Sequence, residues 1–146
     1  MRIYLDNCCF NRPFDDQSQL RIKLESEAKL KIQEDIRAGN HELVWSYILD
    51  YENSKNPFEE RKAQISKWRQ YAKVDVEENA ELIRVARHVL SLGTKKMDAL
   101  HIACAIVAKS DYFLTTDDGI IQYATAIQEV KITDPIGFIK EVSNDF

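Results

Sequence analysis

The chain has 146 residues, with 20 lysines and arginines against 24 aspartates and glutamates, so its formal net charge is −4 with the histidines neutral. A hydrophobic content of 45% excludes a disordered chain, and a length near ~150 residues favours one domain over residues 1–146. The acidic balance argues against a nonspecific nucleic-acid coat protein, and the longest apolar run, Ala99–Ala108, is half as long as a membrane span requires.

The cysteines indicate a reducing compartment. Cys8 and Cys9 are adjacent, Cys104 lies in an apolar run, and no spacing is typical of a zinc site or a disulfide framework. We expect all three to behave as small buried hydrophobic residues. Because an aspartate at position 6 interrupts the N-terminal segment, no secretory signal is expected there. These features predict a cytoplasmic protein that has no membrane partner.

The first half of the chain predicts two strands and a long helix. Residues 2–5 are an apolar run that predicts a buried strand, and turn residues over 11–16 predict a loop. A helix over 18–38 is indicated by apolar residues at every fourth position, namely Leu20, Leu24, Ala28, Ile32 and Ile36. Residues 43–45 predict a second strand, after which Ser46 is positioned to cap a short helix.

The second half alternates helices with short strands. Helices are expected over residues 58–71, 77–92, 98–109 and 118–126, and strands over 112–114 and 130–132. This alternation predicts an α/β fold, a three-layer α/β/α sandwich with a central parallel sheet. Such sheets bind ligands beyond the carboxyl ends of their strands.

Two carboxylates follow the first two strands. Asp6 ends the first strand, where it is either a helix-capping residue or part of a site. Asp50 and Glu52 compete for a second position, because two residues on a helix are separated by ~200° and only one of these side chains can face inward. Glu52 lies on the same side as Ile48 and is the better candidate, while a solvated helix end is the alternative.

Two more carboxylates lie near the third of the expected strands. Asp98 opens an almost entirely apolar helix, where the helix dipole alone would favour it, or it belongs to a site. Asp117 and Asp118 follow the strand at 112–114. We expect Asp118 to cap the next helix and Asp117 to join the other acids. His101, one turn after Asp98, is either a hydrogen-bonded core residue or a ligand.

Gathered at one edge of the sheet, these acids would repel one another unless a cation neutralised them. A cluster of oxygen ligands suits Mg²⁺ or Mn²⁺ and not zinc. The metal-site prediction therefore comprises Asp6, Glu52, Asp98 and Asp117.

At these residues the sequence resembles the PIN domain family of the PilT N-terminus type, whose members are Rossmann-like, metal-dependent ribonucleases that include the VapC toxins. The resemblance covers essentially the whole chain. It is carried by Ile3–Asn7, by Ser46 followed six residues later by Glu52, by Met97–Ala103 and by Phe113–Asp117. Asn7 with Cys8-Cys9, and the segment 11–17, depart from the family pattern and suggest a separate subgroup.

The resemblance implies hydrolysis of RNA phosphodiester bonds, with the four acids as catalytic and metal-binding residues. It also implies an RNA substrate, a small antitoxin protein as partner in a type II toxin–antitoxin pair, and a homodimer. Asn7 and Thr115 would orient a metal-bound water or a carboxylate, with an ordinary strand threonine as the alternative for Thr115.

Positively charged side chains near the acids would bind the phosphates of an RNA substrate. Arg12, Lys95 and Lys96 are candidates for RNA contact. The basic segment 55–73 interleaves Trp68 and Tyr71, which would stack on bases or, alternatively, belong to the core of a solvated helical face.

Two other functions compete. A haloacid-dehalogenase-type phosphatase needs a second aspartate two residues after the first, and Cys8 occupies that position. A catalytically weak PIN-like module that binds RNA or a protein is the alternative that the sequence leaves open.

Overall fold

The computed structural model describes residues 1–142. Its centre is a parallel sheet with strand order β3-β2-β1-β4-β5, in which each neighbouring pair runs parallel. The strands are β1 (Arg2–Leu5), β2 (Glu42–Ser46), β3 (Ala72–Val76), β4 (Tyr112–Leu114) and β5 (Lys131–Thr133). β1 lies in the middle because residues 3–5 are wholly apolar or aromatic and wholly buried. The α/β fold expected from the sequence is confirmed.

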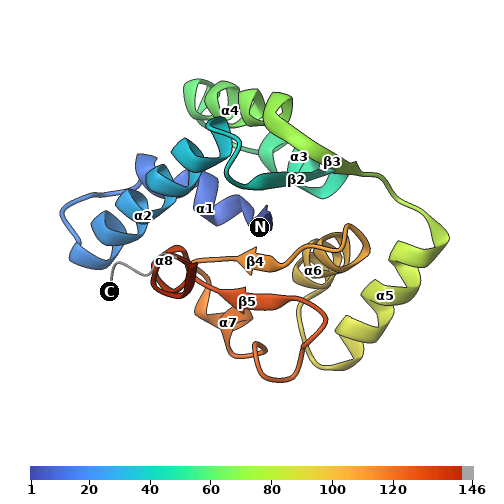
Figure 1. Ribbon diagram of the computed structural model, residues 1–146. Helices are drawn as coiled ribbons and strands as arrows, with labels where there is room; N and C mark the ends of the chain where they lie inside the picture. The colour runs from blue at the N-terminus through green and yellow to red at the C-terminus, as the bar shows by residue number, and fades with distance from the viewer. Residues whose placement is uncertain (143–146) are drawn as a thin grey trace.

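Helices follow most of the strands and flank the sheet. In Figure 1, α2 and α8 lie to the left of the strands, and α5 and α6 lie to the right. The α-helices are α1 (Asn7–Asn11), α2 (Leu20–Arg37), α3 (Tyr47–Ser54), α4 (Glu59–Ser66), α5 (Ala80–Ser91), α6 (Lys96–Val107), α7 (Asp118–Ile121) and α8 (Pro135–Val142). Two 3₁₀ helices, η1 (Arg12–Phe14) and η2 (Lys67–Tyr71), complete them. No helix within residues 1–142 is long and apolar enough to cross a membrane.

Several predicted boundaries were wrong. The loop expected over 11–16 is largely helical, because the backbone passes from α1 directly into η1. β3 was not predicted, since an edge strand with only Val76 buried has no apolar run to reveal it. α8 was not predicted either, and α7 ends at Ile121 instead of residue 126.

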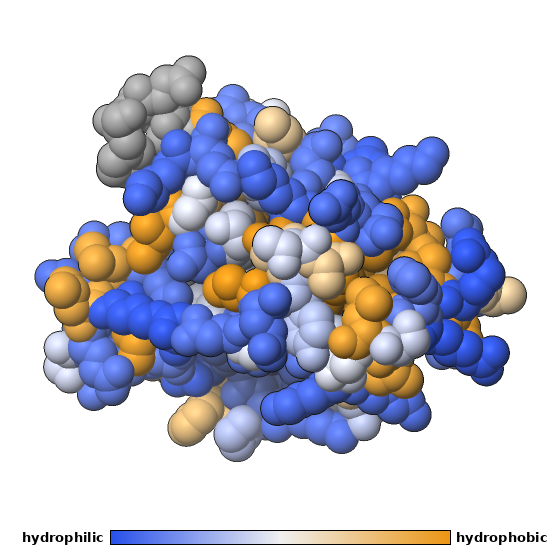
Figure 2. Space-filling view, turned by 90° about the horizontal axis from the view of Figure 1, so that it is seen from below, coloured by the Kyte–Doolittle hydropathy of each residue, from blue (hydrophilic) through white to orange (hydrophobic). Residues whose placement is uncertain are grey.

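The long helix α2 is confirmed, but its predicted apolar stripe is only half buried. Ala28 and the isoleucines at 32 and 36 are buried, whereas Leu20 and Leu24 are exposed. Leu24 lines a shallow apolar groove together with side chains of α8, and hydrophobic side chains reach the surface in the view from below (Figure 2). The face that α2 buries also contains polar residues, namely Glu25, Ser26, Lys29 and Gln33.

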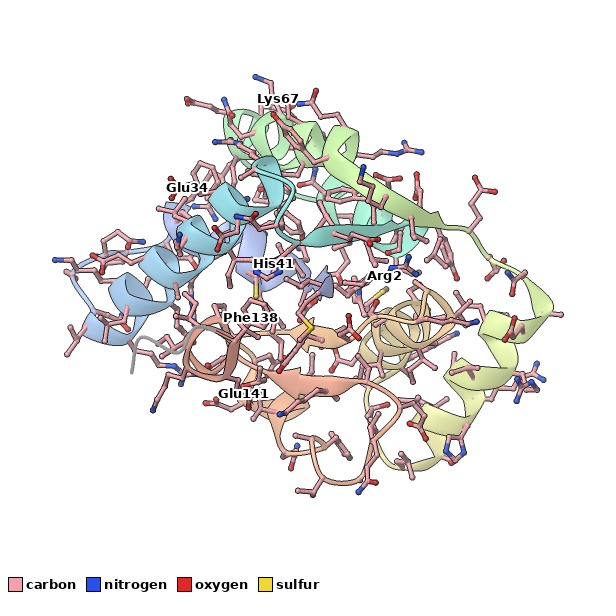
Figure 3. All side chains as sticks on the ribbon, in the orientation of Figure 1. Arg2, Glu34, His41, Lys67, Phe138 and Glu141 are labelled. Atoms are coloured by element: carbon pink, nitrogen blue, oxygen red, sulfur yellow. The ribbon has the colours of Figure 1, made fainter. Side chains whose placement is uncertain are left out.

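Helix α8 packs against the sheet through aromatic rings. The Phe138 ring meets the rings of His41 and Tyr112 edge to face, with centroids 5.3 and 4.8 Å apart. Figure 3 shows Phe138 beside His41 on the inner side of the helix. This packing closes the end of the core that lies away from the carboxyl ends of the strands.

Candidate metal centre

Asp6 lies at the carboxyl end of the central strand, and three groups donate hydrogen bonds to its side chain. Its Oδ1 accepts a hydrogen bond from the backbone N–H of Asn7 (2.8 Å), which makes Asp6 the N-cap of α1. Its Oδ2 accepts from the hydroxyl of Thr115 (2.8 Å) and from the thiol of Cys8 (3.3 Å). The backbone N–H of Asp6 donates to Leu114 (2.9 Å), continuing the sheet. Capping and site geometry are therefore combined in one residue.

Helix α3 brings Glu52 to Asp6 and turns Asp50 away. Ser46 caps this helix as expected, accepting from the backbone N–H of Leu49 (3.2 Å). Glu52 forms a hydrogen bond with Nε2 of His101, whereas Asp50 accepts from the indole N–H of Trp45 (2.9 Å). The ~200° between the two positions explains this division.

His101 is the centre of the arrangement and is only 1% exposed. Its Nε2 faces Glu52 and lies 3.9 Å from Oδ1 of Asp6, while its Nδ1 is 2.6 Å from the hydroxyl of Tyr4. The Tyr4 hydroxyl lies 2.7 Å from Oγ of Ser46. Burial opposes the charged imidazolium. The hydrogen bond to Glu52 and the charges of Asp6 and Glu52 outweigh that penalty and raise the pKa of His101.

Asp98 and Asp117 lie together beside this cluster. Both line a small hollow that Lys95 also borders. Burial and the negative charges of Asp6 and Asp117 raise the pKa of Asp98. Asp98 is thus within electrostatic range of both strand-end aspartates.

Asp118 does not have the helix-capping role that the sequence predicted for it. Asp117, and not Asp118, caps α7, because its Oδ1 accepts from the backbone N–H of Gly119 (2.8 Å). Asp118 instead forms a bidentate ion pair with Arg21 of α2 at 2.9 and 2.8 Å. Asp117 still faces the hollow that Asp98 lines.

The donor set suits a divalent cation. Asp6, Glu52 and His101 each offer one ligand atom, and the three atoms lie within 4.8 Å of one another. The carboxylate oxygens suit Mg²⁺ or Mn²⁺, and the imidazole nitrogen suits a transition metal such as Mn²⁺ better than Mg²⁺. The Oδ1 of Asn7, the residue that follows Asp6, is buried and has no hydrogen-bond partner among residues 1–142. These residues fit the expected metal.

The two polar residues expected to support the site both donate to the Asp6 carboxylate. Thr115 donates to Asp6 and also accepts from the backbone N–H of Asp117 (3.1 Å), so one hydroxyl joins two of the acids. Asn7 contributes through its backbone N–H.

The basic residues that the sequence suggested for RNA contact lie in different parts of the structure. Lys95 borders the hollow of the acids, while Lys96 lines a different groove between α5 and α6. Arg12 donates to the buried Glu25 (3.0 Å) and to Asp15 (3.3 Å), which commits its guanidinium to packing. Trp68 is buried, so of its two interpretations the core residue is the one observed.

Of the two interpretations of His101, the hydrogen-bonded core residue is the one that the structure shows, since the side chain is buried and bonded to Tyr4 and Glu52. Cys9 and Cys104 are buried as expected, and all three cysteines are free. Cys8 is only half-buried and is hydrogen-bonded to Asp6, which nothing in its sequence context indicated.

Comparison with known proteins finds no matching family model and no matching curated protein. Among solved structures, the chain is similar to a chain of the crystal structure of VapBC2 from Rickettsia felis bound to a DNA fragment from their promoter. The two are 15% identical with a TM-score of 0.60, and the match covers 92% of this chain and 98% of that one. At this identity the similarity establishes that the two chains share a fold.

Proposed function

We propose that this protein is a metal-dependent endoribonuclease of the PIN domain type, which hydrolyses RNA phosphodiester bonds at an acidic Mg²⁺ or Mn²⁺ site. Residues 1–146 would form one such domain. The observation that carries the proposal is the convergence of Asp6, Glu52 and His101 at the carboxyl edge of a parallel sheet. The fold shared with a chain of the VapBC2 structure supports it.

Asp6 and Glu52 would hold the cation, with Nε2 of His101 as a third donor and Asp98 and Asp117 completing the acidic surroundings. A divalent cation supplies activation of water and stabilisation of negative charge on a phosphodiester. The protein's own contribution is orientation.

Two hydrogen-bond systems provide that orientation. Thr115, the Asn7 N–H and the Cys8 thiol hold the Asp6 carboxylate, and Tyr4 holds the ring of His101. Because Lys95 borders the acids, it is the lysine best placed to meet a phosphate.

A cleavage assay with a matched pair of variants on α3 tests the proposal. We expect Glu52→Gln to lower Mn²⁺-dependent RNA cleavage by at least ~100-fold, corresponding to about 2.7 kcal/mol of lost transition-state stabilisation. Asp50→Asn, two residues away and facing Trp45, should cleave like the wild type. Asp98→Asn should also lose activity. Equal cleavage by wild type and Glu52→Gln, or none by the wild type with either ion, would refute the nuclease assignment.

A second function has one specific observation in its favour. His101 lies between Asp6 and Glu52, and as an imidazolium it would neutralise both acids without a metal. That arrangement suits a catalytically weak PIN-like module that binds RNA or a protein. Calorimetric titration with Mn²⁺ separates the two functions, because the module would bind no ion at this site, whereas the nuclease would bind one and lose it in Glu52→Gln.

For partners we propose RNA as substrate and a small antitoxin protein, with action as a toxin in the cytoplasm. The similarity to a chain of the VapBC2 structure supports the antitoxin. Co-expression with the product of the neighbouring reading frame tests it, since an antitoxin would copurify and inhibit cleavage. Sedimentation of the purified chain tests the proposed homodimer.

A further inference from the structure

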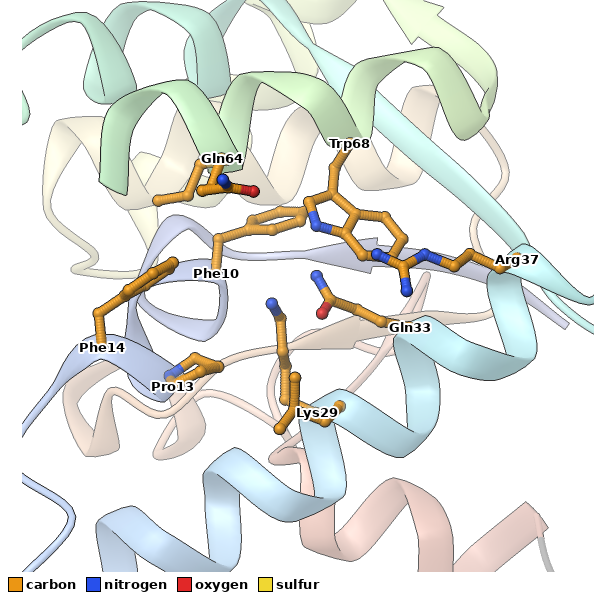
Figure 4. Close-up of a pocket in the computed structure, with 10 residues that line it drawn as sticks. Phe10, Pro13, Phe14, Lys29, Gln33, Arg37, Gln64 and Trp68 are labelled. Atoms are coloured by element: carbon orange, nitrogen blue, oxygen red, sulfur yellow. The ribbon is translucent and has the colours of Figure 1, made fainter. Parts of the chain in front are cut away.

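A second concave feature lies away from the acids, between η1, α2 and α4. Its walls are mostly apolar or aromatic side chains, namely Phe10, Pro13, Phe14, Leu30, Ile65 and Trp68. Figure 4 shows the rings of Phe10 and Trp68 above the pocket and helix α2 below it. An apolar lining of this kind would by itself accommodate an apolar ligand.

The floor of the pocket is polar. Lys29, Gln33 and Arg37 follow one another at intervals of four residues along α2, so they share one face of the helix. Lys29 is 3% exposed and Gln33 is 5% exposed, values unusual for these residue types. In Figure 4 the nitrogen atoms of both side chains point into the space below Phe10 and Trp68.

Neither side chain has a hydrogen-bond acceptor among residues 1–142. Nε2 of Gln33 has no hydrogen-bond partner among the residues that the structure describes. Within residues 1–142 the ammonium of Lys29 has no oxygen acceptor. It lies over two aromatic rings, 5.1 Å from the centroid of Phe10 and 5.8 Å from that of Trp68. Ring faces attract a cation but do not replace an acceptor for its N–H groups.

No acidic side chain within residues 1–142 lines the pocket. Arg37 also lines the pocket, and its guanidinium stacks 4.6 Å from the centroid of Trp68. Burial, reinforced by the charge of Arg37, lowers the pKa of Lys29 to about 7. The pocket therefore combines positive charge and unmet donors with an aromatic wall.

We propose that this pocket binds a small carboxylate that is carried on an aromatic body. A carboxylate is an acceptor without donors, so its two oxygens match the ammonium of Lys29 and the amide N–H of Gln33. The aromatic body would pack between Phe10, Phe14 and Trp68. Inorganic phosphate would satisfy the donors but leave the aromatic wall without a contact.

This binding site is distinct from the metal centre and does not depend on the nuclease assignment. None of the acids of the metal centre lines it, and its test measures binding without any cleavage.

Isothermal titration of the full chain with phenylacetate is the direct test. We expect saturable binding at one site, weakened at least ~tenfold in Lys29→Met, because the variant keeps the packing and removes a charge-assisted hydrogen bond. Lys31→Met is the matched control, since Lys31 is an exposed lysine of the same helix that pairs with Asp35, and it should bind like the wild type. Phenylacetamide, which has the same shape without the charge, should bind at least ~tenfold more weakly than phenylacetate.

A second variant keeps the test decisive if Lys29→Met fails to fold. Gln33→Glu places a carboxylate beside Lys29 inside the pocket, so it should abolish phenylacetate binding and raise the melting temperature. The proposal is overturned if folded wild-type protein shows no saturable binding, or if phenylacetamide binds as well as phenylacetate. Phosphate binding as tightly as phenylacetate would overturn the choice of an aromatic carboxylate.

Discussion

The hydroxyl of Thr115 donates a 2.8 Å hydrogen bond to the Asp6 carboxylate, joining residues 109 positions apart in the sequence. The register explains the contact, since Leu5 pairs with Leu114 as the last residues of their strands, and Asp6 and Thr115 directly follow them. The same hydroxyl accepts from the backbone N–H of Asp117. Thr115 thereby couples the orientation of one acid to the backbone of another.

Thr115→Val removes this hydroxyl and keeps the shape of the side chain. We expect the free energy of unfolding to fall by about 1.5 to 3 kcal/mol, because a hydrogen bond to a buried carboxylate is lost. Chemical denaturation measures it. Thr116→Val is the control, since no hydrogen bond of its hydroxyl is found within residues 1–142, and its change should be smaller. Equal losses in the two variants would contradict a specific role for Thr115.

Tyr4→Phe tests the support of His101. Nδ1 of His101 loses its partner in this variant, and Oγ of Ser46 keeps only the backbone N–H of Leu49 among residues 1–142, so we expect a loss of about 1 to 3 kcal/mol. Thermal unfolding with a calorimeter provides the measurement. Tyr112→Phe is the matched control, because its hydroxyl bonds to the surface residue Glu141, and it should change stability by less than about 0.5 kcal/mol.

If Tyr4 also positions the ring for metal binding, the affinity of Tyr4→Phe for Mn²⁺ should fall while that of Tyr112→Phe does not. Unchanged Mn²⁺ affinity in both would limit Tyr4 to a role in packing.

Asp98→Asn should stabilise the metal-free protein at neutral pH. The pKa of Asp98 is raised in the folded state by burial and by the charges of Asp6 and Asp117, so its contribution to stability is fully present below the unfolded pKa of about 4 and is lost as pH rises through the folded pKa. Removing the charge avoids this loss, worth roughly 0.5 kcal/mol because solvent screens a partly exposed group.

The measurement is unfolding free energy between pH 3 and pH 7 in chelator, with Glu129→Gln as an exposed control. We expect the difference between Asp98→Asn and wild type to grow with pH and to shrink when Mn²⁺ is added. A difference that is independent of pH would mean that the acids do not repel one another in the folded protein.

The variant Arg12→Met distinguishes a packing role of Arg12 from a role in RNA contact. Arg12 bonds to the fully buried Glu25, which in the variant keeps only Arg21 (3.4 Å) as an ion-pair partner among residues 1–142. Since an underpaired buried charge is costly, we expect a loss of about 2 to 4 kcal/mol, measured by denaturation. Arg84→Met, at an exposed position on α5, should cost less than about 0.5 kcal/mol. A stable Arg12→Met protein with weakened RNA binding would restore the RNA-contact interpretation.

The amino-acid sequence by itself determined the elements with strong apolar patterns and the acids next to them. Residues 2–5 and 112–114 are apolar runs too short to be helices, so their strands and the aspartates that end them follow from local pattern. Helical periodicity likewise favoured Glu52 over Asp50, and the contacts of both side chains agree with it.

Only the tertiary structure decided which partners the polar residues find. Arg21 meets Asp118 across 97 positions and leaves Asp117 to cap α7, while Arg12 turns to Glu25 and His101 comes to lie between Asp6 and Glu52. Pairings of this kind depend on the distance between side chains of separate elements, which no local periodicity encodes. β3 was not predicted for the same reason. This strand is defined by its pairing with β2 and has no apolar pattern of its own.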